Sequence, residues 1–202
     1  FKQEAELADA LLNPNDRAFS VPQLFDFIQK AGLAFGRWIK QAPYSPRCGV
    51  LAKLPQASHL AQLSFLEQSA AVELFRGSML RHSAILYHGD IPTGLQPVNF
   101  SGDEWPGYVP IRASDTICIR ERLPAGAAAV LINQAHVYRD LFMPIDPVEK
   151  RWFDAIDGKH SIGNLVEQTS SQKGAQLEAA RRFFERLWWY DQVVFDASDT
   201  VP

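Results

Sequence analysis

The stretch LFRGSMLRHSAILYHGD, residues 74–90, joins a helical pattern to a strand pattern near the middle of the 202-residue chain. Its first part places Leu74, Phe75 and Met79 on one side of a predicted helix, and residues 84–87 are typical of a strand. No other stretch combines so many hydrogen-bonding and titratable side chains with so much apolar surface. We therefore expect the fold and any binding site to be organised around it.

Side chains of this stretch are the candidates for contacts with a ligand or with another domain. Arginine presents a planar pair of donors that matches a carboxylate or a phosphate. The candidates are Arg76, Arg81, His82, Tyr87, His88 and Asp90. One hypothesis is that Arg76, Arg81 and His82, on or near one helical edge, bind an anion. The simpler interpretation is that they pair with local carboxylates or face water.

A metal site is a further alternative. His88 and Asp90 are two residues apart, so on a strand they would face the same way. Together with His136 they would supply the two imidazoles and one carboxylate of a non-haem iron oxygenase. Those enzymes need a large β-barrel-like scaffold, whereas this chain is predicted to be helical at both ends. Residues 89–92 also resemble a turn more than the interior of a strand, so a polar strand end is the simpler interpretation.

The N-terminal third is predicted to contain two helices and a strand. Apolar residues favour a helix over residues 2–12, and Ser20 with Gln23 forms a capping box for a second helix. Residues 33–39 are the predicted strand. Residues 43–55 are a proline-rich connection and a candidate domain boundary.

The middle of the chain is predicted to combine helices with short strands. We expect a short helix over residues 57–62 and a longer one over residues 65–80, despite Gly77. Residues 125–132 are predicted to form a further short helix. Short β-like runs with turn residues between them indicate a small antiparallel sheet. These runs are residues 85–87, 98–100, 108–109 and 116–119.

The last third has the clearest helix signals. Asp146 is a predicted helix cap, with Pro147 at the first helical position and Glu149 at the capping-box position. Ser161 is the predicted cap of the next helix. A longer helix is predicted over residues 175–190, with Arg181 and Glu185 as an exposed pair one turn apart. Residues 192–195 form the predicted terminal strand. Three helices followed by a strand are the outline of a winged-helix-like module.

Composition excludes several classes of protein. The chain is 47% hydrophobic and 21% charged, as folded proteins commonly are, and its net charge of −3 disfavours a general nucleic-acid binder. Two isolated cysteines, Cys48 and Cys118, indicate reduced thiols in a cytoplasmic protein. No apolar run approaches the roughly 20 residues that span a bilayer, so we expect no membrane partner.

Several blocks together resemble a known family. Residues 13–24, NPNDRAFSVPQL, and 31–33, AGL, resemble the late helix and strand of class I S-adenosylmethionine-dependent methyltransferases. Four further blocks resemble the C-terminal extension of a bacterial branch of that family, a regulatory region followed by a winged-helix-like end. They are FGRWIKQAPYSPRCG, ELFRGSMLRHSAILYHGD, LPAGAAAVLIN and FDAIDGKHSIGNL.

The departure from that family concerns the cofactor. The family binds S-adenosylmethionine on a glycine-rich loop after the first strand of its catalytic domain, with an acidic residue at the end of the second strand. Neither pattern occurs here, and Gly32 and Gly36 follow a predicted helix rather than a strand. The resemblance therefore implies that S-adenosylmethionine belongs to a full-length protein. We expect no catalytic, cofactor-binding or metal-ligating residue in this chain, which begins with Phe1 as a part of a longer protein would.

We expect an α+β protein in three parts. Residues 1–45 are the tail of a methyltransferase-like region, residues 46–140 a central helix with a small antiparallel sheet, and residues 141–202 a winged-helix-like module. The resemblance implies a non-catalytic C-terminal region that packs on the upstream catalytic domain and contributes to methyl-acceptor recognition or regulation. A stand-alone winged-helix module that binds nucleic acid or protein is one alternative, and an iron oxygenase using His88, Asp90 and His136 is another.

Overall fold

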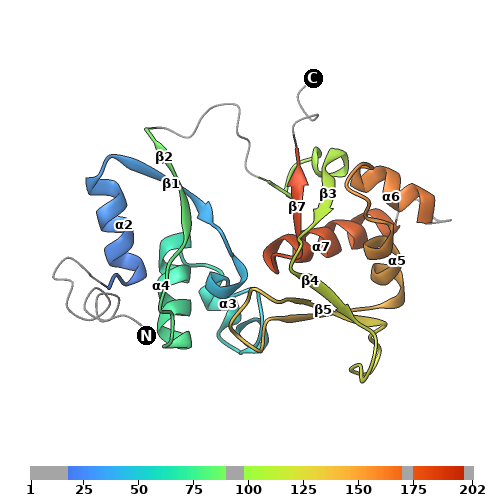
Figure 1. Ribbon diagram of the computed structural model, residues 1–202, viewed down its shortest axis with the longest axis horizontal. Helices are drawn as coiled ribbons and strands as arrows, with labels where there is room; N and C mark the ends of the chain where they lie inside the picture. The colour runs from blue at the N-terminus through green and yellow to red at the C-terminus, as the bar shows by residue number, and fades with distance from the viewer. Residues whose placement is uncertain (1–17, 90–97, 170–174, 198–202) are drawn as a thin grey trace, which may run out of the picture.

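The computed structural model describes residues 18–89, 98–169 and 175–197, and the fold is α+β, which confirms the expected class. Residues 18–89 form an N-terminal lobe and residues 98–197 a C-terminal lobe, which lie side by side (Figure 1). The helix predicted over residues 2–12 lies outside the described residues. No helix in the described ranges has the length and apolar content needed to cross a bilayer.

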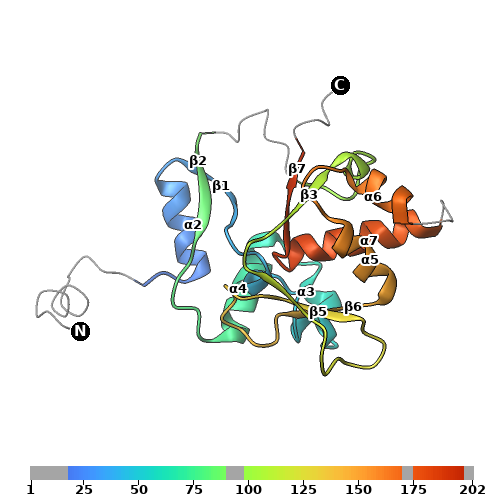
Figure 2. The same cartoon turned by 45° about the vertical axis from the view of Figure 1, so that its right-hand side comes forward.

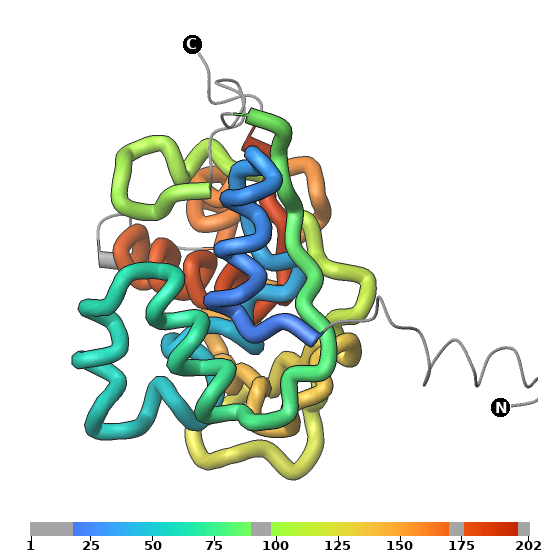
Figure 3. The backbone as a smooth tube through the Cα atoms, turned by 90° about the vertical axis from the view of Figure 1, so that its left-hand side faces the viewer, coloured from blue at the N-terminus to red at the C-terminus, as the bar shows by residue number. Residues whose placement is uncertain are grey.

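The N-terminal lobe is a two-stranded ribbon with helices packed against it. Helix α2 (Val21–Lys30) begins at the predicted capping box, in which the side chains of Ser20 and Gln23 each accept a hydrogen bond from the other's backbone N–H. Strands β1 (Leu33–Trp38) and β2 (Ala84–His88) form the antiparallel ribbon. Helix α2 lies on the side of the ribbon away from the C-terminal lobe (Figures 1 and 3). Its partner α4 (Phe65–Arg76) also begins at a capping box.

Aromatic side chains form the core of this lobe. Trp38 is 1% exposed and stacks on Tyr44 with ring centroids 3.9 Å apart. Phe25 and Phe35 pack around them, 4.7 Å apart. Gly36 lies at an irregularity of the ribbon, and a Cβ atom there would lie 2.4 Å from the ring of Tyr87. Only glycine therefore allows the ring of Tyr87 to lie across the ribbon at this point.

Helix α4 is shorter than predicted. The expected helix over residues 65–80 ends at Arg76, because Gly77 adopts the left-handed conformation with φ 63° and closes the helix. The following residues connect α4 to β2 without helical structure. Arg81 and His82 consequently do not share a helical edge with Arg76, contrary to the prediction.

Between β1 and α4 the chain forms short helical turns. They are η1 (Ala42–Tyr44), η2 (Leu51–Lys53) and α3 (Ala57–Leu60). Although this segment is rich in proline, residues 42–46 are buried throughout. It is therefore a packed connection that lies between the lobes, as the contacts described below show.

In the described residues of the C-terminal lobe, two small sheets pack with the helices α5, α6 and α7, as Figure 2 shows. The elements of this lobe are η3 (Trp105–Gly107), β3 (Val109–Arg112), β4 (Thr116–Ile119), β5 (Ala129–Asn133), β6 (Phe142–Ile145), α5 (Pro147–Ala155), α6 (Ile162–Thr169), α7 (Ala175–Trp189) and β7 (Val193–Asp196). Strands β4, β5 and β6 form an antiparallel meander, and β7 returns to pair with β3. The largest apolar core of the described residues fills this lobe, with Trp152, Phe183 and Phe184 almost fully buried.

The predicted helix over residues 125–132 is wrong. Residues from Ala129 form β5, the central strand of the meander, whose Val130 and Leu131 are buried. A strand covered on both faces is a continuous apolar run, which has no period that separates it from a buried helix. The turn before it contains Gly126 with φ 80°, a conformation that a helix does not allow.

Two further local predictions are wrong. Residues 98–100 form no strand, because the backbone of Asn99 bonds to the hydroxyl of Tyr108 and its side chain accepts from Ser101 N. Arg181 pairs with Glu178 in two hydrogen bonds of 2.7 and 2.8 Å instead of pairing with Glu185. Glu185 instead accepts from Arg47, 3.1 Å away in the connection between the lobes.

Strand pairing joins parts of the chain that are far apart in sequence. Strand β1 in the expected first part pairs with β2 in the second, and β3 in the second pairs with β7 in the third. These pairs bridge the expected boundaries after residues 45 and 140, which stay predictions. The helices α5, α6 and α7 follow each other as the winged-helix outline requires, and β7 follows them.

Candidate functional site at the lobe junction

Asp191 connects the two lobes. It lies in the turn after α7 with φ 53°, and its side chain is 11% exposed. Its Oδ1 accepts from Gln41 N at 2.9 Å, and its Oδ2 accepts from Ala42 N at 2.9 Å. The Nε2 atom of His136 lies 2.9 Å from the same Oδ2. One carboxylate therefore satisfies two backbone amides of the N-terminal lobe and one imidazole of the C-terminal lobe.

A buried arginine forms the second connection. The side chain of Arg76 is 3% exposed and donates to Asp140 Oδ1 at 2.8 Å and to Pro43 O at 3.2 Å. Its guanidinium lies 4.3 Å from the ring centroid of Tyr138. Burial disfavours the charge on Asp140, but hydrogen bonds from Arg76 and Val50 N outweigh it and hold the pKa of Asp140 below its ordinary value.

His82 anchors the segment that connects α4 to β2. Its Nε2 lies 2.8 Å from the carbonyl oxygen of Phe19, an acceptor, so this nitrogen carries the proton. In the neutral ring, Nδ1 then accepts from the hydroxyl of Tyr44 at 2.8 Å. Burial raises the pKa of Tyr44 above its ordinary value, so its phenol stays protonated. Glu73, 3.3 Å from Nε2, also accepts from Val21 N and ties α4 to α2.

A cavity of about 740 Å³ lies where these connections meet. Three segments far apart in sequence line it, namely residues 39–44, 78–83 and 135–138. The lining residues are Ile39, Lys40, Pro43, Tyr44, Ser78, Met79, Leu80, Arg81, Ser83, Ala135, His136, Val137 and Tyr138. Lys40 Nζ donates to Ala135 O at 2.9 Å and so holds two of the segments together. The volume is in the range of cavities that bind small organic molecules.

The lining suits recognition more than covalent chemistry. Lys40 and Arg81 are its cationic side chains, and no carboxylate is among the described residues that line it. Ser78 donates its hydroxyl hydrogen to Arg76 O, and His136 is occupied at Nε2 by Asp191. No serine in the lining has a hydrogen-bonded base within the described part of the chain, so a nucleophile of the hydrolase type is not assembled.

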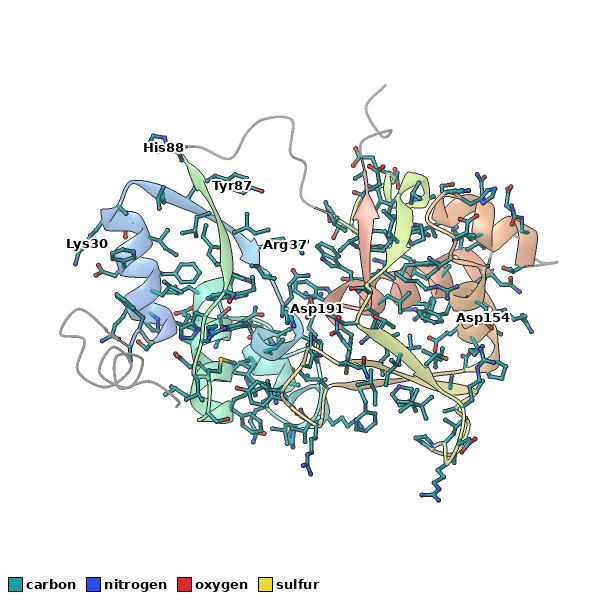
Figure 4. The ribbon with its side chains drawn as sticks, viewed as in Figure 1. Lys30, Arg37, Tyr87, His88, Asp154 and Asp191 are labelled. Carbon is teal, nitrogen blue, oxygen red and sulfur yellow. The ribbon has the colours of Figure 1, made fainter. Side chains whose placement is uncertain are left out.

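The structure divides the predicted site residues into two groups. Arg81 is exposed and lines the cavity, whereas Arg76 and His82 lie behind its walls and position them. Tyr87 and His88 lie farther along β2, with His88 at the exposed end of the ribbon (Figure 4). Asp90 lies outside the described residues. The predicted group is therefore not assembled around one point.

The proposed iron ligands are also separated. His136 bonds Asp191, and Figure 4 shows Asp191 at the junction of the lobes and His88 at the far end of the ribbon. Within the described ranges, no three His, Cys, Asp or Glu side chains are grouped to hold a metal ion. The structure thus does not bring His88 and His136 together.

Several residues of the site were not predicted from the sequence. Lys40 and Tyr138 at the cavity and Asp140 and Asp191 behind it each act through a partner far away in sequence. One sequence feature could have indicated this site. The segment that follows β1 has few charged residues and combines proline, tyrosine and cysteine. Such a segment is typical of buried chain, although its prolines also suggested a domain boundary.

A scan of the sequence against models of protein families finds no family that matches.

Proposed function

We propose that the chain is the non-catalytic C-terminal region of a bacterial S-adenosylmethionine-dependent methyltransferase. It packs on an upstream catalytic domain and contributes to recognition of the methyl acceptor or to regulation of transfer. The proposal begins from the resemblance of residues 13–24 and 31–33, which lead into α2 and β1, to the late helix and strand of that catalytic domain. S-adenosylmethionine then binds upstream, and this chain binds no cofactor.

The open β1–β2 ribbon is the observation that carries the proposal. Strand β2 pairs with β1 and with no other strand of the described chain. A two-stranded ribbon is only marginally stable by itself, and the unpaired backbone groups of an edge strand readily pair with a further strand. Ile85 and Leu86 on β2 are 37% and 36% exposed, so apolar surface is also available. The ribbon with α2 therefore has the form of an edge that continues the sheet of another domain.

The cavity supports a role in binding the acceptor rather than the donor. In the family that the chain resembles, an acidic residue contributes to the donor site. The described lining of the cavity instead carries Lys40 and Arg81 and no carboxylate. A positive, mostly apolar cavity favours a ligand without the positive sulfonium of S-adenosylmethionine.

The cysteines support a reducing compartment. Cys48 and Cys118 are both free thiols, and Cys48 is buried beneath the carbonyl of Trp189. Free cysteines without a disulfide are typical of cytoplasmic proteins. We propose on this basis that the protein is cytoplasmic.

Hydrogen exchange tests the packing on an upstream domain. Amide exchange of residues 84–88 is compared by mass spectrometry between this chain alone and the full-length protein. We expect slower exchange of β2 in the full-length protein, because its free edge is then paired. The meander β4–β5–β6 is the internal control and should exchange equally in both. Equal exchange of β2 in the two proteins would contradict the proposal.

A further inference from the structure

The cavity at the lobe junction combines apolar walls with positive charge. Its apolar lining includes Ile39, Pro43 and Met79, together with the rings of Tyr44 and Tyr138. At its rim, Leu80 is 99% exposed and Val137 is 81% exposed. Large side chains that are this exposed on two facing loops leave apolar surface that a bound molecule would cover.

The positive groups are available for an anion. Arg81 is exposed, and no hydrogen bond or ion pair occupies its guanidinium within the described part of the chain. Lys40 donates one of its three Nζ hydrogens to Ala135 O, which leaves two for a ligand. Neither group faces a carboxylate among the described lining residues, so the charge at the cavity is not neutralised from within. A carboxylate is one of the anions, with phosphate, that a guanidinium binds with two parallel hydrogen bonds, and it is the one that a mostly apolar small molecule commonly carries.

The imidazole of His136 is a further polar group of the lining, and one of its two nitrogens has no partner in the described chain. The side chain of His136 is 1% exposed, and its residue lines the cavity. Its Nε2 bonds Asp191, but its buried Nδ1 has no hydrogen-bond partner in the described chain. Buried polar atoms are rarely left unsatisfied, because the loss of water is then uncompensated. This atom marks the His136 wall of the cavity as polar, although Nδ1 itself is not accessible to a ligand.

The walls are held in place before any ligand arrives. Arg76 fixes the carbonyl of Pro43, and His82 fixes the hydroxyl of Tyr44. Asp191 fixes both His136 and the backbone of Ala42. The first two bonds fix the walls within the N-terminal lobe, and Asp191 joins that lobe to His136. Binding therefore does not require the cavity to be assembled from flexible parts. Preorganisation of this kind lowers the entropic cost of binding.

From these observations we infer that the junction cavity binds a small organic acid, with its carboxylate on Arg81 and an apolar body between the walls. The inference deepens the proposed function, because it names the chemical class of the methyl acceptor. It rests on that function only for the role of the acid as acceptor. Binding itself depends on the residues of this chain alone.

Calorimetric titration of the 202-residue chain with 4-phenylbutyrate tests the inference. The uncharged isostere 4-phenylbutyramide and the cation 4-phenylbutylamine are the matched probes. Two variants are compared, Arg81→Met at the cavity and Arg120→Met at an exposed position of the loop after β4. Both remove one positive charge, so a general electrostatic effect would be equal in the two. Arg81 is exposed and without described partners, so its replacement leaves the fold intact.

We expect 4-phenylbutyrate to bind about tenfold more tightly than the amide, as expected for one charge-assisted hydrogen bond, and the amine to bind weakest. Arg81→Met should weaken carboxylate binding by about the same factor and leave amide binding unchanged. Arg120→Met should bind all three probes as the wild type does. Absence of binding, equal binding of acid and amide, or equal loss in both variants would overturn the inference.

The two proposals fail separately. The titration contains no S-adenosylmethionine and no upstream domain, so a negative result concerns the cavity alone. Suppose that the acid binds through Arg81 but that β2 exchanges equally in the chain and in the full-length protein. Acid binding at the cavity is then supported, and the methyltransferase proposal is contradicted.

Discussion

Replacement of Asp191 by alanine tests whether one carboxylate holds the lobes together. The side chain accepts three hydrogen bonds of 2.9 Å, from Gln41 N, Ala42 N and His136 Nε2. Its loss leaves these donors buried without an acceptor. Each donor that does not reach water then lowers the free energy of unfolding by about 1–3 kcal/mol. Alanine at φ 53° adds about 1 kcal/mol of backbone strain. We therefore expect Asp191→Ala to lower the free energy of unfolding by about 4–6 kcal/mol.

Asparagine at the same position gives a graded result. It tolerates positive φ, and its amide oxygen can keep the bonds to Ala42 N and His136 Nε2. Its amide nitrogen then faces Gln41 N, and two donors oppose each other. We expect Asp191→Asn to cost about 1–2 kcal/mol, which is one lost bond.

Urea unfolding followed by tryptophan fluorescence measures both costs. The signal is the sum over five tryptophans, and it follows both lobes because Trp38 in the N-terminal lobe and Trp152 in the C-terminal lobe are each 1% exposed. Asp154→Ala is the control, because within the described residues this exposed carboxylate pairs with Lys150 alone, one turn away. Its loss should lower the free energy of unfolding by less than about 0.5 kcal/mol. If Asp191→Ala were as stable as Asp154→Ala, the reasoning would be refuted.

Three further predictions concern the thiols, a helix end and the response to acid. Burial raises the pKa of the Cys48 thiol far above its ordinary value, so iodoacetamide should modify Cys118 first and Cys48 only on unfolding, and equal rates by mass spectrometry would contradict this. Gly77→Ala should cost about 1 kcal/mol in urea unfolding, because φ is 63° there while nothing lies within 4 Å of the added Cβ. Gly102→Ala, whose φ is not in the left-handed region, should be nearly neutral, and a neutral Gly77→Ala would count against the helix end described. The lowered pKa of Asp140 means that its stabilising charge is fully present above its ordinary pKa of 3.8 and is lost as the pH falls through the lower folded value. The difference in stability between wild type and Asp140→Asn should therefore be constant from about pH 5 to 8 and shrink below pH 3.8, and a difference that changes near neutral pH would contradict this assignment.

Local signals predicted helix starts well. The capping boxes at Ser20 and Asp146 occur where the sequence indicates them, because a cap is satisfied within four residues. The apolar run around Val130 was misjudged, since its state depends on neighbouring strands on both sides. Gly77 was judged compatible with a continued helix, but its freedom to adopt positive φ ends the helix one residue before it.

The candidate site could be predicted only in part. The stretch around residues 74–90 does contribute Arg81 to the cavity, and Arg76 and His82 support its walls. The partners that give these residues their roles are not in that stretch. Asp140 lies 64 residues beyond Arg76, and Tyr44 lies 38 residues before His82. Contacts over such separations depend on the packing of the lobes, which no local pattern in one sequence records.

Calorimetric titration with S-adenosylmethionine tests the central proposal most directly. The account assigns recognition to this chain and the methyl donor to a domain upstream. It predicts no saturable heat when S-adenosylmethionine is added to the 202-residue chain, and one-to-one binding when it is added to the full-length protein. Tight one-to-one binding of S-adenosylmethionine by this chain alone would contradict the account.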